Sequence, residues 1–227
     1  MTSDLGRTTS DLGRVPVYLE TGSTRVFAVA AGWPGWCRSG RDEQAALAAL
    51  AEYAERYEAV PAAAGLPFPG EDLRVEVVER LPGSTTTDFG APGAVATGDG
   101  ESVGPAEGRR SAGLLTACWE LLDGVAAQSP EELRKGPRGG GRDCSAIVGH
   151  VARAEFSYAR KVGVRHRESE EPDAVAALRA ALLEVVLSGR PVEPVRGRQW
   201  PLRYAVRRVA WHVLDHAWEI EDRRPAG

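Results

Sequence analysis

Alternating and β-rich segments of the sequence are confined to its first part. Residues 17–20, 25–29 and 73–79 predict β-strands, and Thr21-Gly22-Ser23 predicts a turn that joins the first two as a hairpin. A Pro-Gly turn at Pro34-Gly35 leads to a third expected strand. These segments indicate a small sheet built mainly from neighbouring strands.

A helix is expected between the third strand and the last one. Asp42 is placed to cap it, and its apolar stripe runs from Leu47 to Tyr57, with Pro61 past its end. The order of elements is therefore β-β-β-α-β, and we assign this module to residues 15–88.

The apolar spacing becomes purely helical after residue 105. Four long amphipathic helices are predicted, at about 108–127, 144–161, 172–189 and 203–222. Ser129-Pro130-Glu131-Glu132 has the form of a capping box with proline in the first turn and predicts a further short helix. Four such helices favour a four-helix bundle over residues 105–227. The fold class expected is thus α+β with two domains.

Two segments are expected to lie outside both domains. Residues 2–7 and 9–14 repeat the same six letters, TSDLGR, and contain little apolar surface, so we interpret residues 1–14 as a mobile tail. Residues 89–104 are rich in Gly, Pro, Thr and Ala and are interpreted as a linker.

Composition narrows the functional classes. The net charge is −4 and the pI about 5.7, which gives no general attraction to nucleic acid or to anionic membranes. Cys37, Cys118 and Cys144 form no CxxC pair, which argues against a disulfide framework and a zinc ribbon. We found no signal peptide and no apolar stretch of the roughly 20 residues that span a bilayer. A cytoplasmic protein without a nucleic-acid or membrane partner is expected.

Three of the four histidines point to a metal site. His212 and His216 are four residues apart, so they share one face of the last helix, and Glu219 follows one turn later as a candidate to orient an imidazole. His150 lies on the apolar face of the second long helix. Three imidazoles suit Zn²⁺ or Ni²⁺ and leave a coordination position open. The alternative is a bundle whose polar edge binds no metal.

Other polar residues have weaker assignments. His166 lies in a polar segment and is expected at the surface. Glu155 lies about 140° around the helix from His150, so a salt bridge is expected instead of a role at the metal. Arg207 and Arg208 are candidates to hold an anionic substrate, although an exposed helix edge is the simpler explanation of both.

The N-terminal part resembles the HicB-like antitoxin domain. The resemblance rests on the turn Trp33-Pro34-Gly35-Trp36-Cys37, on Gly40, and on the helix start Asp42-Glu43-Gln44-Ala45-Ala46-Leu47. It implies a small module related to a truncated RNase H fold and a protein partner. Neither a helix-turn-helix nor a basic ribbon follows, so no nucleic-acid partner is expected.

The C-terminal half resembles the DinB-like superfamily. The residues that carry the resemblance are the helix containing Ile147-Val148-Gly149-His150-Val151 and the segment Trp211-His212-Val213-Leu214-Asp215-His216. The resemblance implies a four-helix bundle that binds a divalent metal through His150, His212 and His216. It also implies transferase, isomerase or hydrolase chemistry on a small molecule, often with a low-molecular-weight thiol such as mycothiol or bacillithiol.

Two functional hypotheses follow. The first is a metal-dependent enzyme of this kind. The second is a protein-binding or antitoxin-like protein, in which the HicB-like module recognises a partner and the bundle is a scaffold or the interface of a homodimer.

Overall fold

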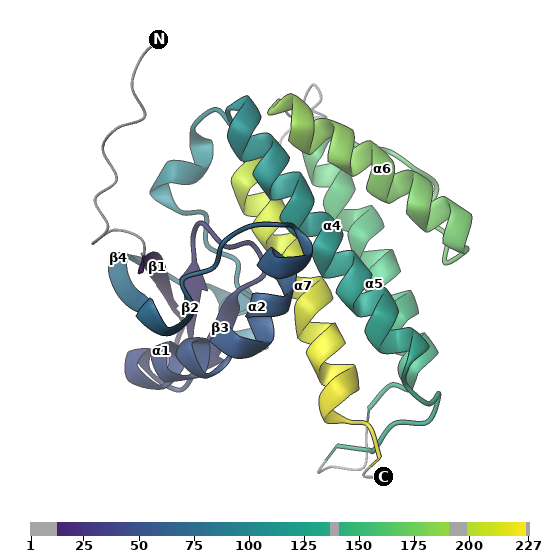
Figure 1. Cartoon of the computed structure of the whole chain (residues 1–227), viewed down its shortest axis with the longest axis horizontal. Coiled ribbons are helices and arrows are strands. Elements are labelled where there is room, and N and C mark those ends of the chain that lie inside the picture. The colour runs from purple at the N-terminus through teal and green to yellow at the C-terminus, as the bar shows by residue number, and fades with distance from the viewer. Residues whose placement is uncertain (1–12, 137–140, 191–198, 226–227) are drawn as a thin grey trace. The chain divides into compact units, whose positions relative to one another are not determined.

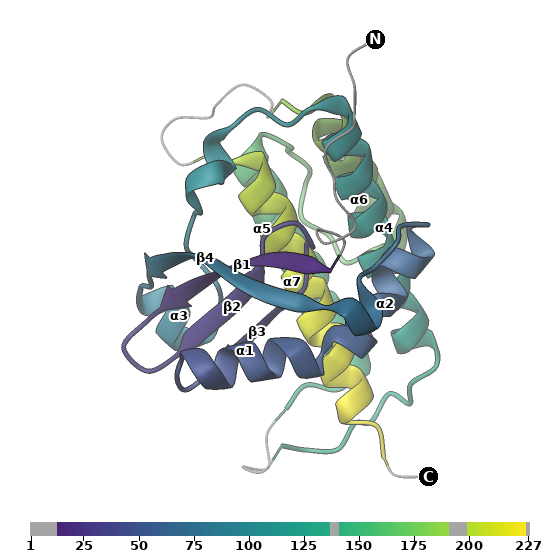
Figure 2. The ribbon, with the colours of Figure 1, turned by 60° about the vertical axis from the view of Figure 1, so that its left-hand side comes forward.

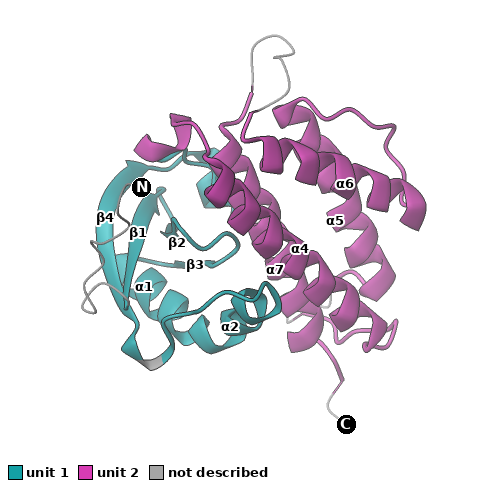
Figure 3. Cartoon of the chain, turned by 45° about the horizontal axis from the view of Figure 1, so that its top comes forward, with its two compact units in different colours: residues 1–96 teal, residues 97–227 magenta. Residues whose placement is uncertain are grey.

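The computed structural model describes residues 13–136, 141–190 and 199–225. It divides into two units, residues 1–96 and 97–227 (Figure 3). This boundary falls inside the segment 89–104 that the sequence analysis treats as a linker. Most of the expected tail, residues 1–12, lies outside the described residues, and the first strand already begins at Arg14.

The first unit is built on a four-stranded sheet in the order β3-β2-β1-β4 (Figure 2). Strand β1 pairs antiparallel with β2 and parallel with β4, and β2 pairs antiparallel with β3. The strands are β1 Arg14–Thr21, β2 Val26–Ala30, β3 Cys37–Gly40 and β4 Arg74–Pro82. The predicted strands are confirmed, and β4 lies beside the first strand.

The helix expected after β3 is present as two consecutive helices, α1 Glu43–Glu52 and α2 Ala54–Ala63. The Asp42 carboxylate caps α1 by accepting a hydrogen bond of 2.8 Å from the backbone N–H of Ala45. Pro61 lies inside α2 and not past its end. A short helix, α3 Thr85–Phe89, follows β4 and was not predicted. A 3₁₀ turn, η2 Gly70–Asp72, precedes β4.

An aromatic cluster fills the space beside the Pro-Gly turn. Trp36 stacks on Tyr57 with ring centroids 5.5 Å apart, and Phe68 meets the edge of Trp36 at 5.2 Å. Both polar ends of the stacked pair are satisfied, because Trp36 donates to the carbonyl of Leu50 and Tyr57 to that of Pro34. Buried aromatic side chains therefore fix the turn against the two helices.

The side chain of Glu20 joins the end of the first unit to its sheet. Glu20 is fully buried, and its carboxylate accepts hydrogen bonds from the hydroxyl of Thr87 and from the backbone N–H groups of Gly93 and Ala94. The segment predicted as a linker is thus held in place at its start. The start of this segment is therefore ordered by a carboxylate more than 70 residues away in the chain, which composition does not reveal.

The second unit contains the four predicted long helices (Figure 1). Their bounds are α4 Pro105–Ala127, α5 Cys144–Ala159, α6 Pro172–Ser188 and α7 Leu202–Asp222. Helix α4 packs against α7 and α6, and α5 packs against α7 and, less closely, against α6 and α4. Two 3₁₀ turns complete the unit, η3 Thr97–Gly100 and η4 Arg160–Val162.

The short helix predicted from the capping box at Ser129 is absent from the described residues. The carboxylate of Glu131 instead accepts hydrogen bonds from the backbone N–H and the hydroxyl of Ser145, in the first turn of α5. A hydrogen-bonded contact across the loop thus forms in place of the predicted capping box.

Helix α7 is buried along most of its length. Its Arg207 pairs with Asp99 of η3 at 2.6 Å, and both side chains are almost fully buried. Within the described residues, no helix is both apolar enough and long enough to cross a membrane.

We predict that Glu20→Ala destabilises the first unit by about 3 kcal/mol, because it leaves the buried Thr87 hydroxyl and the part-buried backbone N–H groups of Gly93 and Ala94 without their acceptor. The measurement is chemical denaturation of the full chain, with hydrogen exchange at the amides of Gly93 and Ala94. The control, Glu58→Ala, removes an exposed carboxylate from α2 and should shift stability by less than about 0.5 kcal/mol. Unchanged exchange at both amides in Glu20→Ala would contradict the assigned role.

Candidate metal centre

Three histidine side chains converge between α5 and α7. His150 is half-buried on α5, His212 is buried on α7, and His216 lies one turn further along α7. The ring of His150 is 5.1 Å from that of His212 and 5.0 Å from that of His216, measured between centroids. The two rings on α7 are 4.6 Å apart. The structure therefore brings together the three residues that the sequence singled out.

The three imidazoles can hold one metal ion. One ligand atom from each residue lies within 4.8 Å of the other two. Two nitrogens bound to a tetrahedral zinc ion lie about 3.4 Å apart, so small rotations of the rings suffice. Nδ1 of His212 is buried and has no hydrogen-bond partner among the described residues. A buried polar atom without a partner is costly in an apoprotein, and a metal or a ligand in this space can remove that cost.

Glu219 orients one of the rings. Its carboxylate lies 2.7 Å from Nδ1 of His216, and its other oxygen pairs with Arg223 at 2.7 Å. The carboxylate accepts this hydrogen bond, so Nδ1 of His216 carries the proton. Nε2 of His216 therefore keeps its lone pair for a ligand. The hydrogen bond to His216 holds the pKa of Glu219 below its ordinary value, and Arg223 acts in the same direction. The carboxylate thus occupies the position that the sequence analysis expects of it.

Burial keeps two of the histidines neutral. It lowers the pKa of His212 to about 2, with further lowering by His216, His150 and Arg208. The pKa of His150 is also lowered, first by burial and then by His216 and nearby arginines. Neutral imidazole is the form that binds a metal, so the site is preorganised for that role.

Arg207 and Arg208 point in different directions. Arg208 lies one turn before His212 on the same face, and its guanidinium carbon is 4.9 Å from the ring centre of Trp211 and 5.6 Å from that of Tyr158. Arg207 is directed to Asp99 and buried. The exposed-edge interpretation is therefore wrong for Arg207, whereas substrate binding by Arg207 stays a prediction. The two arginines face apart because neighbouring residues on a helix are separated by about 100°.

An aromatic wall beside the histidines was missed by the sequence analysis. The ring of Tyr158 is 5.6 Å from that of His212 and 5.2 Å from that of Trp200, which in turn lies 4.9 Å from Tyr204. Tyr158 follows His150 by about two turns of α5, which was the available signal. Tyr158 shares the apolar face of that helix with Ile147 and Val151, and this pattern by itself indicates a core residue.

Glu155 and His166 stay away from the histidine cluster. Glu155 is buried and forms an ion pair of 3.1 Å with Arg179 of α6, which confirms the expected salt bridge. His166 lies between η4 and α6 and is partly exposed.

Comparison with known proteins gives no match. No family model matches the chain, and neither the curated proteins nor the solved structures contain a significant match. The site must therefore be interpreted from its own geometry.

We predict that the chelator-treated protein loses stability on acidification because of His212. The folded state keeps His212 neutral down to a pKa of about 2, whereas the unfolded state takes up a proton near pH 6.5. The unfolded state thus binds more protons in this interval, and His212 alone lowers the free energy of unfolding by up to about 1.4 kcal/mol per pH unit.

The measurement compares wild type with His212→Gln by denaturation between pH 7.5 and 5. The groups that act on His212 besides His216 are His150, Arg142 and Arg208, and all three remain in the variant. Wild type should lose stability more steeply than the variant. Parallel curves for the two proteins would show that His212 is not held neutral.

Proposed function

We propose that residues 105–227 form a DinB-like four-helix bundle and that the protein is a metal-dependent enzyme acting on a small molecule. The observation that carries the proposal is the convergence of His150 from α5 with His212 and His216 from α7. The order of the ligand helices and the Glu219 carboxylate behind His216 support it. The three histidines and the order of their helices are the features by which the sequence resembles that superfamily.

The ligand set favours Zn²⁺ or Ni²⁺. Ca²⁺ and Mg²⁺ prefer oxygen ligands, whereas neutral imidazoles suit borderline transition metals. A divalent ion held by three protein ligands supplies a Lewis acid with a free position, at which the pKa of a thiol or of water falls. Partial exposure of His150 and His216 leaves a route for an exogenous ligand.

The surroundings of the histidines favour an anionic substrate. Arg142 and Arg153 each lower the pKa of His150, and Arg142 and Arg208 lower the pKa of His212. Positive charge therefore acts on the site from three places, namely α7, α5 and the loop that precedes α5. Tyr158 offers an aromatic surface at the same place. We propose that Arg208 attracts a carboxylate or another anionic group of the substrate.

The chain supplies no activated cysteine of its own near the site. Burial raises the pKa of Cys118 and of Cys144, which keeps both as thiols. Both are buried, as is Cys37 in the first unit. We therefore propose that the nucleophile is a low-molecular-weight thiol. Its proton would pass to solvent on binding, and its sulfur would form a bond to an electrophilic carbon of the substrate while the bond from that carbon to its leaving group breaks and the leaving group departs with the electron pair. Hydrolysis by activated water is the competing chemistry.

The alternative function is partner recognition by the first unit, as proposed from its HicB-like sequence. Its elements follow the order expected from that resemblance, because three strands are followed by helices α1 and α2 and then by a further strand, β4. Three large apolar side chains of this unit are exposed, Phe89 at 94%, Val78 at 56% and Val95 at 46%. Single exposed residues are common, so this observation carries less weight than the histidines.

We predict that the purified protein binds about one divalent ion per chain through His150, His212 and His216. Elemental analysis and titration with Zn²⁺ measure it, and each single His→Ala change should weaken binding by at least about tenfold. His166→Ala is the matched control and should bind as wild type does. Stoichiometric metal in the triple alanine variant would remove the basis of the proposal.

We predict that the metal-loaded protein transfers a thiol to an electrophile and that His216→Ala abolishes the activity. The assay screens glutathione, mycothiol and bacillithiol against anionic electrophilic substrates, with activated esters in thiol-free buffer as the hydrolytic arm. Arg208→Ala should raise KM more than it lowers kcat, because the proposed role is attraction of the substrate. Turnover of esters without thiol would favour hydrolysis, and no turnover in either arm would favour the partner-binding alternative.

A further inference from the structure

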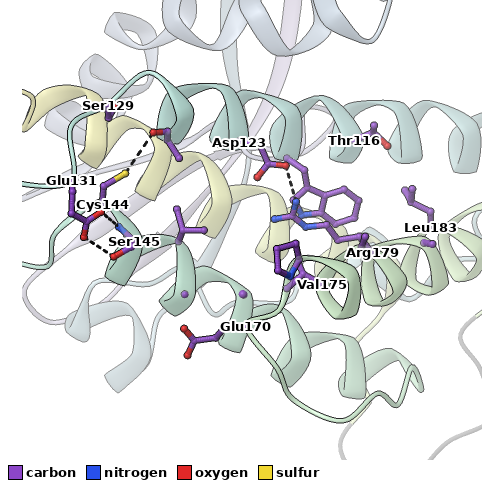
Figure 4. A pocket seen from close by; sticks show the side chains of 18 residues that line it. Thr116, Asp123, Ser129, Glu131, Cys144, Ser145, Glu170, Val175, Arg179 and Leu183 are labelled. Atoms are coloured by element: carbon purple, nitrogen blue, oxygen red, sulfur yellow. Dashed lines mark hydrogen bonds and ion pairs between the residues drawn. The ribbon is translucent and has the colours of Figure 1, made fainter.

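A cavity lies in the second unit, between α4, α5 and α6 (Figure 4). Its volume is about 1000 Å³, which is at the upper end of the range for small-molecule sites. Val148 and Ala152 of α5 line it, and each lies about 160° around the helix from His150. None of the three histidines lines it. The cavity is therefore on the opposite side of α5 from the candidate metal centre.

Small residues on all three helices keep this space open. They are Ala126 on α4, Gly149 and Ala152 on α5, and Ala176 and Ala180 on α6. A leucine at any of these positions would project into the space. Valine and leucine side chains complete a mainly apolar wall.

The single guanidinium among the residues that line the cavity is committed to two carboxylates. Arg179 pairs with Asp123 and with Glu155 at 3.1 Å each, and its Cζ lies 5.2 Å from the ring centre of Trp119. Trp119 in turn donates its indole N–H to Glu155, which is buried. Loss of Arg179 from this network would leave a buried carboxylate unpaired, which is costly. Arg179 therefore offers little attraction to an anionic ligand.

Two carboxylates of the lining are also paired. Asp123 pairs with Arg179, and Glu170 pairs with Arg153 of α5. The side chains of Asp123 and Glu170 are 58% and 55% exposed, so water screens the field that remains. Neither carboxylate therefore favours a cationic ligand.

The third carboxylate of the lining, from Glu131, lies at one end of the cavity beside Ser145 (Figure 4). It accepts hydrogen bonds from the backbone N–H and the hydroxyl of Ser145. Besides the effect of burial, Glu131 raises the pKa of Cys144 and Arg224 lowers it, so charges of both signs act at this end. The cavity as a whole thus combines an apolar wall with charges that are already compensated.

The lining suits a small molecule better than a protein partner. Protein interfaces centre on large apolar or aromatic side chains that the free protein exposes. Among the described residues of the second unit, Leu187 is the one large apolar side chain that is exposed, and it does not line the cavity. The exposed part of the wall on α6 consists of small residues such as Ala176 and Ala180.

The dimensions of the cavity favour a broad ligand. On α6 the lining runs from Pro172 to Leu183, which is about 16 Å of helix. A volume of about 1000 Å³ over this length is much wider than one extended alkyl chain. A ring system contacts more of such a wall at once, and each close contact adds dispersion attraction.

We propose that this cavity binds a neutral, ring-containing apolar molecule, such as a polycyclic or terpenoid alcohol or ketone. A charged ligand would lose its hydration here without gaining an unpaired countercharge, whereas a neutral ligand leaves the existing ion pairs in place. The site needs neither the metal nor the histidines, because the two sites occupy opposite faces of α5.

Fluorescence titration of the full chain with three pyrene probes tests the preference for a neutral ligand. 1-Pyrenemethanol, 1-pyrenemethylammonium and 1-pyreneacetate carry a neutral, a cationic and an anionic end on the same ring system. 1-Pyrenemethanol should bind at one site per chain, at least about tenfold tighter than either ion, which corresponds to about 1.4 kcal/mol. Titration of Arg208→Ala keeps attraction of the anion to the histidine site out of the comparison. Equal or tighter binding of either ion would overturn the proposal.

Filling the cavity tests its location. Ala176→Leu places a larger side chain in the space from an exposed position of α6 and should weaken binding of 1-pyrenemethanol by at least about tenfold. Ala177→Leu is the matched control, because Ala177 is exposed on the same helix but does not line the cavity. Circular dichroism checks that both variants fold. Wild-type affinity in Ala176→Leu would place the probe elsewhere and overturn the proposal.

Competition between two alcohols with the same number of carbons tests the shape of the ligand. Cyclododecanol should displace 1-pyrenemethanol at a lower concentration than 1-dodecanol does, because the ring fills the width of the cavity. More effective displacement by 1-dodecanol would overturn the ring-containing body.

The competing occupant of the cavity is a second copy of this chain. Light scattering should give the same mass for wild type, Ala176→Leu and Ala177→Leu. A wild-type dimer that Ala176→Leu converts to a monomer, and that Ala177→Leu leaves intact, would replace the small molecule by a protein interface and overturn the proposal.

Discussion

The second unit depends on one constraint, which is that helix α7 is largely buried although it carries many polar side chains. Each of these groups needs a partner, because an unpaired buried charge costs several kcal/mol (about 3–5). Arg207 meets Asp99, Arg203 meets Glu107, and His216 meets Glu219. The contacts of Arg207 and Arg203 reach η3 and α4, so they fix the rotation of α7 about its axis, whereas Glu219 lies on α7 itself and orients only the ring of His216. That rotation in turn places His212 and His216 against α5.

Helix α5 separates two chemically different environments. One face presents His150 to α7, beside arginines that make the surroundings positive. The opposite face carries Val148 and Ala152 at a cavity rimmed by carboxylates. Glu155 joins α5 to α6 and α4 through Arg179 and Trp119. Removing Glu155 would therefore disturb both environments through the position of the helix, without direct contact to a metal.

The first unit is held together by different means. In its aromatic cluster of Trp36, Tyr57 and Phe68, the polar atoms of Trp36 and Tyr57 donate hydrogen bonds to backbone carbonyls. The carboxylate of Glu20 accepts hydrogen bonds from the segment that leads out of the unit. Close packing also fixes the start of α1, since a Cβ on Gly40 would lie 2.3 Å from the backbone nitrogen of Ala46. The residues of the Pro-Gly turn and Gly40 thus have structural roles that require no partner protein.

Local periodicity in the sequence determined the strands, the four long helices and the shared face of His212, His216 and Glu219, because these depend on neighbours within a few residues. It did not determine which face of each helix meets another element. Arg207 and Arg208 look equivalent as letters, yet one is buried against Asp99 and the other lies beside the histidines. Glu131 belongs to a segment that matches a capping pattern, but its carboxylate binds Ser145. Residues 89–104 have the composition of a linker, but they contain hydrogen-bond and ion-pair partners of Glu20 and Arg207. Such pairings join residues that are far apart in the chain, so only the tertiary structure could decide them.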